Sequence, residues 1–154
     1  MKELLEYRKQ LTARLVSASK EFRDACLALN DPFEPLDNSW NAHQLAAHAR
    51  DVHKLVYGSR ALRTAREDNP EFQNFDGDTY MAKHYSADES LDNILNDLMT
   101  GVRDVTETLN ALPVEAWSRV SRHATLGSGF TLQSWVERDL AHIEEHLATV
   151  KTGK

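Results

Sequence analysis

Hydrophobic residues recur along most of the chain in alternating steps of three and four, the spacing of one face of an α-helix. The pattern covers residues 2–29, 39–66, 86–109 and 131–150. The stripes are Leu4, Leu11, Leu15, Ala18, Phe22, Ala25 and Leu29; Leu45, His48, Val52, Leu55, Ser59 and Leu62; Leu91, Leu95, Leu98, Val102, Val105, Leu109 and Leu112; and Leu132, Val136, Leu140, Ile143, Leu147 and Val150. Four long amphipathic helices without a strand signal predict an all-α four-helix bundle.

The segments between these helices carry start signals and loop signals. Ser39 and Thr131 are the expected N-caps of the second and last helices. A short extra helix is expected over residues 114–119. The polar link that follows contains Gly127-Ser128-Gly129, which has no preceding strand signal, and we interpret it as a loop rather than a phosphate-binding motif.

A long connection, residues 67–86, joins the second predicted helix to the third. A structureless loop of this length is unusual in a compact domain unless it has a function. Its aromatic residues predict that it is ordered and folds over one end of the bundle, with one short helix near residues 79–83. His84 lies in this connection and is interpreted as a surface histidine.

Composition and charge narrow the class of protein. The 154 residues suit one domain with one core, and the net charge of −6 without a cluster of Lys or Arg argues against nucleic acid as a partner. No apolar run approaches the ~20 residues that cross a bilayer. Cys26 is the single cysteine and is expected to pack as a small apolar residue, with a nucleophilic role as the alternative. These features predict a cytoplasmic protein.

Two histidines in the last helix, His142 and His146, are the strongest candidates for chemistry. They are four residues apart, so their rings project from the same helix face and can bind one divalent ion. His48 occupies a core-facing position of the second helix, where a buried polar side chain needs a partner. Three imidazoles would leave an open coordination sphere, but a half-exposed pair and a core histidine bonded to a carboxylate or carbonyl are equally consistent with the pattern.

The neighbouring ionisable residues are assigned by spacing alone. Asp139 and Asp51 each lie one turn from a candidate ligand, so they are candidates to orient it, although both are equally consistent with solvated charges. His43 and His53 are five residues from His48 and point away from it, so we expect them to be solvated.

The chain resembles the DinB-like (DinB/YfiT) superfamily of small bacterial metal-binding four-helix proteins. The resemblance rests on Trp40 leading the second helix, then Leu45-Ala46-Ala47-His48, and on the pair His142-x-x-x-His146 about ninety residues later. The stretch Trp117-x-Arg119, His123-x-x-x-Gly127 and Thr131-Leu132 also resembles the approach to the last helix in some members.

The resemblance covers nearly the whole chain, residues 1–154, and implies a single domain with helices in up-down-down-up order. It implies that His48, His142 and His146 are metal ligands, with zinc, nickel and iron equally suited to imidazole. It also implies a homodimer and a small-molecule substrate. No membrane partner is expected, because the chain has no long apolar run.

Relatives that use low-molecular-weight thiols make a metal-dependent thiol transferase or hydrolase-like enzyme the leading hypothesis, with no catalytic residue identified. A non-catalytic small-ligand-binding or stress-response protein is the alternative, and a metal-free bundle is a third. Metal affinity is expected to fall below about pH 6, where imidazoles protonate.

Overall fold

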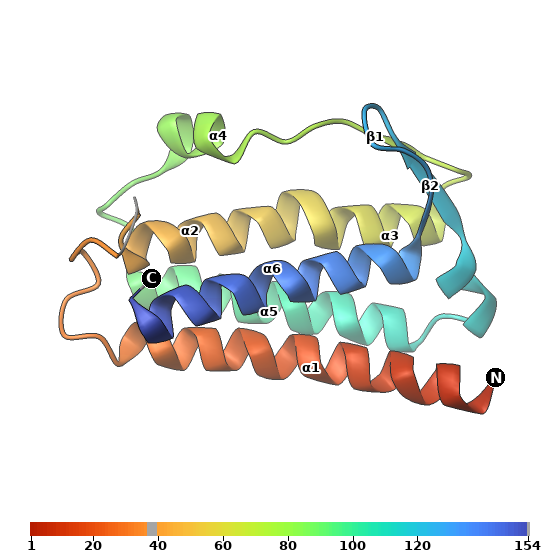
Figure 1. Cartoon of the computed structure of the whole chain (residues 1–154), viewed down its shortest axis with the longest axis horizontal. Helices are drawn as coiled ribbons and strands as arrows, with labels where there is room; N and C mark the ends of the chain where they lie inside the picture. The colour runs from red at the N-terminus through yellow and green to blue at the C-terminus, as the bar shows by residue number, and fades with distance from the viewer. Residues whose placement is uncertain (37–39, 154) are drawn as a thin grey trace.

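Four long helices lie side by side in the computed structural model, which describes residues 1–36 and 40–153 (Figure 1). The elements in chain order are α1 (Lys2–Leu27), α2 (Ala42–Val52), the π-helix η1 (His53–Tyr57), α3 (Gly58–Arg66), β1 (Glu71–Phe72), α4 (Gly77–His84), α5 (Leu91–Asn110), the 3-10 helix η2 (Val114–Ser118), β2 (Val120–His123), β3 (Gly127–Thr131) and α6 (Leu132–Thr152). The all-α four-helix bundle predicted from the periodicity is confirmed, with a small sheet added at one end.

The long helices follow the up-down-down-up order that the resemblance implied. In Figure 1, α1 and α6 run in one direction, whereas α2–α3 and α5 run in the other. Helix α1 packs against α5 and α6, α2 packs against α5, and α3 packs against α6. The start of α2 therefore lies at the same end of the bundle as the last turns of α6.

The helix ends show which start signals the chain uses. Thr131 caps α6 as predicted, because its hydroxyl accepts from the Ser134 backbone N–H at 3.1 Å. Ser39 lies outside the described residues, and the N-cap of α2 is Asn41. Asn41 and Gln44 form a reciprocal capping box, which satisfies two backbone N–H groups that would otherwise lack partners.

The second predicted helix is interrupted by the π-helix η1, which changes the face that its second half buries. The Gly58 N–H donates to the carbonyl of His53, five residues earlier, so the turn holds one extra residue. Leu55, expected in the stripe, is 42% exposed, whereas Val56 and Arg60 are buried. A Cβ at position 58 would lie 2.6 Å from the His53 carbonyl oxygen, so this close turn requires glycine.

The polar link interpreted as a loop is instead a β-hairpin, and this prediction was wrong. Strand β2 pairs antiparallel with β3 and parallel with β1, in the order β1-β2-β3. Its inward face carries polar residues, Ser121 and His123, while Val120 is 44% exposed. The usual apolar alternation is therefore absent, and backbone pairing together with the hydrogen bond from Trp135 Nε1 to Ser121 Oγ holds the hairpin.

The hydrophobic core runs along the bundle between the four helices. Its largest fully buried side chains are Trp135, Phe22, Leu15, Ile94, Leu95, Leu98, Leu109, Leu132, Ile143, His43, Val102 and Val136. Among the described residues, no helix combines the length and apolarity that crossing a bilayer requires.

Candidate metal centre

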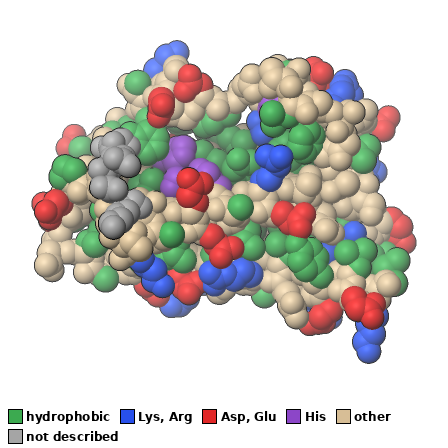
Figure 2. All heavy atoms as spheres, viewed as in Figure 1, with side chains coloured by type: hydrophobic (Ala, Val, Ile, Leu, Met, Phe, Trp, Pro, Cys, Tyr) green, Lys and Arg blue, Asp and Glu red, His purple; other side chains and the backbone are tan. Residues whose placement is uncertain are grey.

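The three predicted ligands meet at the end of the bundle where α2 begins and α6 ends. His48 comes from α2, and His142 and His146 come from neighbouring turns of α6. All three are partly buried, with ligand nitrogens within 4.8 Å of one another. Figure 2 shows histidine side chains gathered in a hollow beneath the segment that carries α4. Antiparallel packing of α2 and α6 is what brings these residues together.

The distances between the ring nitrogens suit one small ion. The Nε2 atom of His142 lies 3.2 Å from Nε2 of His48 and 2.8 Å from Nε2 of His146. Nitrogens at 2.0–2.1 Å from a tetrahedral ion are roughly 3.3 Å apart, so the three rings need only small shifts to share one. The Nδ1 atom of His142 is buried without a hydrogen-bond partner among the described residues. The ring is therefore not held by structural hydrogen bonds at both nitrogens.

The protonation of the triad favours metal binding. Burial, and then the neighbouring rings, lower the pKa of His142 to about 4 and that of His146 to about 3. Burial also lowers the pKa of His48, although the charges of Asp51 and Asp78 oppose this. Neutral rings keep the lone pairs that a metal requires. Because these pKa values are lowered, the pH at which protonation weakens metal binding is expected to lie below the pH 6 expected from the sequence.

A cavity of about 240 Å³ opens beside the triad. Its walls are His48, Val52, Val56, Tyr57, Arg60, Asn74, Phe75, Gly77, His123 and His142. The connection of residues 67–86 supplies Asn74, Phe75 and Gly77 to the wall, and it approaches so closely that a Cβ on Gly77 would lie 3.0 Å from His48 Cε1. The ring of Trp40 packs against that of His48 with the two centroids 4.8 Å apart, which is a physical reason for a Trp at the start of this helix.

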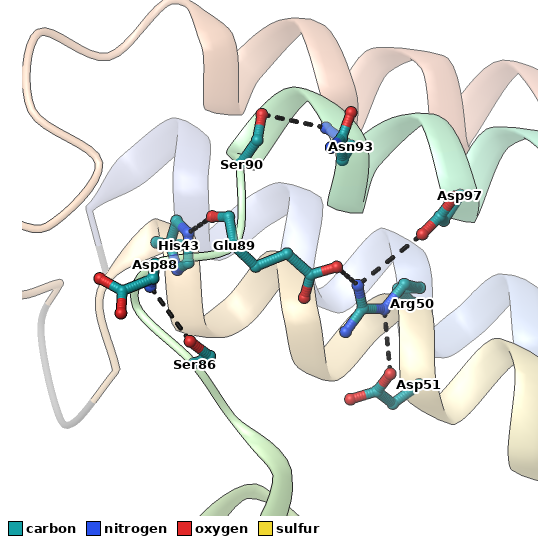
Figure 3. Close-up of polar contacts among 9 residues, drawn as sticks. All are labelled: His43, Arg50, Asp51, Ser86, Asp88, Glu89, Ser90, Asn93 and Asp97. Carbon is teal, nitrogen blue, oxygen red and sulfur yellow. Dashed lines mark hydrogen bonds and ion pairs between the residues drawn. The ribbon is translucent and has the colours of Figure 1, made fainter.

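His43 is not solvated, which corrects the prediction from spacing. It is 1% exposed and stacks on Phe33 at 4.7 Å. Its Nε2 donates to the Glu89 carbonyl at 2.7 Å, so Nδ1 is the acceptor for the Tyr85 hydroxyl at 2.6 Å. Figure 3 shows the bond between the His43 ring and the Glu89 carbonyl, and the ion pair of Arg50 with the Glu89 carboxylate at 2.6 Å. Both contacts fasten the connection after α4 onto α2.

His53 is also buried, at 2% exposure, which the same spacing argument missed. Its Nδ1 lies 2.7 Å from Oδ2 of Asp139. Burial acts to lower the pKa of His53, but the charge and hydrogen bond of Asp139 raise it overall. Asp139 therefore pairs with His53 and does not orient a triad histidine, so that prediction was wrong.

Three other residues considered in the sequence analysis, Asp51, Cys26 and His84, form no hydrogen bond to the triad histidines among the described residues. Asp51 accepts a hydrogen bond from Arg50 Nε at 3.0 Å, and no bond joins it to His48 among the described residues. Cys26 is buried in the core, and burial raises the pKa of its thiol to about 12, so it is not a nucleophile. His84 is exposed, as predicted, and stacks on Tyr80 at 4.2 Å.

Three residues of the cavity were not singled out as functional by the sequence. Tyr57 packs against the His142 ring at 5.7 Å, and Arg60 and His123 line the far wall. Arg60 faces inward only because of the extra residue in η1, and His123 faces inward because of the hairpin. Of these three residues, only His123 had a signal in the sequence. It belongs to the stretch that resembles the approach to the last helix in some DinB-like members, but it was not identified as a site residue.

A large groove of about 800 Å³ runs along α2, α3 and α5. Both acidic and basic residues line it, including Arg50, Asp97 and Asp104. None of the three triad histidines contributes to it. The smaller cavity is therefore the one relevant to a metal.

Comparison with known proteins identifies the fold. No known family profile matches the sequence, and no curated protein matches it significantly. The structure is similar to that of YfiT from Bacillus subtilis, described as a probable metal-dependent hydrolase with an unusual four-helix bundle topology. The TM-score is 0.87 at 18% sequence identity, over 96% of this chain and 86% of YfiT. The four-helix-bundle fold that the resemblance implied is thus confirmed.

Proposed function

We propose that this protein is a metal-dependent enzyme acting on a small molecule, with His48, His142 and His146 as the metal ligands. The observation that carries the proposal is the convergence of three Nε2 atoms on one point beside a cavity. Two of these rings have strongly lowered pKa values and thus stay neutral near pH 7. Three protein ligands leave a coordination position open, which is the arrangement of catalytic rather than structural sites.

A divalent ion at this site supplies Lewis-acid chemistry, since it lowers the pKa of a water or thiol and polarises a substrate carbonyl. The chain's own residues orient the ligands and shape the access. Trp40 and Gly77 both pack against the His48 ring, and Tyr57 packs on His142. Asn74 and Phe75, from the segment after β1, form part of the cavity wall.

The single cysteine of the chain is not available as a nucleophile. Cys26 lies in the core with its pKa raised to about 12. The cavity of about 240 Å³ is smaller than the roughly 300–1,000 Å³ of typical ligand pockets, which leaves little room for both a thiol cofactor and a substrate. We therefore favour a hydrolase-like reaction with water, which agrees with the description of YfiT. Transfer of a low-molecular-weight thiol is the second candidate, because that reaction also needs no protein nucleophile.

The experiment separates metal binding from chemistry. Purified protein is loaded with zinc, nickel or iron(II), and its metal content is measured. It is then tested with small esters and amides, and in parallel with bacterial thiols and the electrophile monobromobimane. Activity in the loaded protein that is absent from His48→Ala and from chelator-treated protein supports the proposal. Metal binding without any turnover favours a ligand-binding protein, and absence of metal binding contradicts both.

A further inference from the structure

Arg60 is a buried cation that has no anionic partner among the residues the structure describes. It is 8% exposed and lines the cavity beside the triad. Among the described residues no carboxylate forms an ion pair with it, and its one protein hydrogen bond runs from Nη2 to the Gln73 carbonyl at 2.8 Å. A buried charge without a partner is costly. A ligand that brings a negative charge into the cavity would relieve that cost.

Aromatic rings hold the guanidinium group of Arg60 in place. The guanidinium carbon lies 4.9 Å from the centroid of the Trp135 ring and 5.6 Å from that of Phe72. These contacts, together with the bond to Gln73, hold the planar group in one orientation. Its Nε and Nη1 donors make no hydrogen bond to a described residue. An arginine oriented in this way presents a fork that matches the two oxygens of a carboxylate.

His123 provides a second donor on the same wall. Its Nδ1 accepts the backbone N–H groups of Thr125 and Leu126, each at 3.2 Å. Because backbone N–H groups only donate, the ring proton must be on Nε2. Burial, and then the charges of Arg60 and Arg138, lower the pKa of His123, so the ring stays neutral. It therefore adds a hydrogen-bond donor next to Arg60 without adding a second positive charge.

We propose that Arg60 and His123 form a carboxylate-binding subsite, so that the substrate is a small carboxylic acid derivative with its reactive group toward the triad. This rests on the proposed function, since the same cavity joins the subsite to His142. Arg60 lies twelve residues after His48, or about three helical turns, so the carboxylate and the reactive group are at opposite ends of the substrate. One cation and one neutral donor match a singly charged carboxylate better than a phosphate dianion.

The test measures binding of butyrate to the zinc-loaded full-length protein by calorimetry, with butyramide and inorganic phosphate as probes of charge and shape. Arg60→Gln should weaken butyrate binding roughly 10- to 100-fold, as expected for loss of a charged hydrogen-bonding partner. Arg63→Gln is the matched control and should bind as wild type, because Arg63 pairs with Glu67 at the surface. Both variants keep the three histidines, so a carboxylate bound at the ion itself would not distinguish them.

Arg60→Lys keeps the charge but loses the planar fork, and should bind with intermediate affinity. Thermal unfolding shows whether Arg60→Gln folds. If it does not, butyrate binding by Arg60→Lys is the test of the subsite. Wild-type butyrate affinity in Arg60→Gln (or in Arg60→Lys, where Arg60→Gln does not fold), or tighter binding of phosphate or butyramide than of butyrate, would overturn the subsite. Unchanged zinc content in these variants shows that such a failure leaves the metal proposal standing. Absence of zinc from the wild type would instead contradict the metal proposal.

Discussion

Helix α2 and the π-helix η1 carry two kinds of histidine, which differ in what their ring nitrogens contact: His43 and His53 are of one kind, and the triad ligand His48 is of the other. His43 and His53 are more deeply buried than His48. Each of them has a protein oxygen as partner, from Tyr85 and Glu89 for His43 and from Asp139 for His53. In the triad, the Nε2 atoms face one another instead.

This difference distinguishes structural histidines from candidate ligands better than burial does. A ring whose nitrogens bond to fixed oxygens contributes to folding and has no lone pair to offer. Three neutral rings that meet at Nε2 cannot satisfy one another fully, because each Nε2 either donates one proton or offers one lone pair, and three such atoms match only one donor with one lone pair. The triad is therefore the candidate to bind an ion, whereas His43 and His53 bond to the chain around it.

The largest expected effect concerns His53. Replacing it with Ala leaves the Asp139 carboxylate buried without its partner, which should destabilise the protein by about 3–5 kcal/mol. Urea denaturation measures this change. His84→Ala is the control and should have almost no effect, because His84 is exposed. Equal stability of the two variants would remove the distinction between the two kinds of histidine.

Loss of one triad histidine should act on metal binding. Structural zinc sites bind with about 10–16 kcal/mol for up to four ligands, so His142→Ala should cost on the order of 3–4 kcal/mol, or several hundredfold in affinity. Competition with a chromophoric chelator measures the affinity. His53→Ala, where folded, should bind metal within a few-fold of wild type. Full metal content in His48→Ala would show that the triad is not the site.

The two kinds of histidine should respond oppositely to pH. The lowered pKa of His142, about 4, means that the metal-free folded protein resists protonation. Stability is then lost as pH falls from about 6.5 toward 4, by on the order of 2 kcal/mol at pH 5 for this ring. His53 has a raised pKa, so its contribution is present below about pH 6.5 and is lost as pH rises through the folded-state value.

Unfolding free energies of the metal-free protein at pH 7 and pH 5 measure these contributions. His142→Ala should lose less stability than wild type on acidification, and His53→Ala should lose more. If the wild type and both variants had the same pH dependence of stability, the lowered pKa of His142 and the raised pKa of His53 would both be contradicted.

The smallest expected effect concerns the attachment of the segment over the cavity. Tyr85→Phe removes the hydroxyl that donates to the buried Nδ1 of His43, at a cost of about 1–2 kcal/mol. Hydrogen exchange should become faster in residues 77–90, with little change in α1. Tyr80→Phe is the control, since the Tyr80 hydroxyl makes no hydrogen bond to the described residues. Faster exchange throughout the bundle would indicate a general loss of stability instead.

Much of the fold and the triad were predictable from local pattern. The three-and-four spacing predicted the four long helices, and Thr131 was identified as a cap from its type and position. His142 and His146 share a face because of helix geometry alone. The antiparallel approach of His48 is not a local property, and the resemblance to the DinB-like superfamily supplied it.

The spacing of residues along the chain determined the four long helices and placed His142 and His146 on one helix face, because both depend on hydrogen bonds between residues close in the chain. The tertiary structure decided the rest. The extra residue in η1 turned Arg60 inward and Leu55 outward, and the hairpin brought His123 to the cavity. Burial of His43 and His53 depends on Glu89 and Asp139, each more than forty residues away. Helical spacing assigns a residue to a face, but which face is covered, and by which partner, depends on contacts between distant parts of the chain.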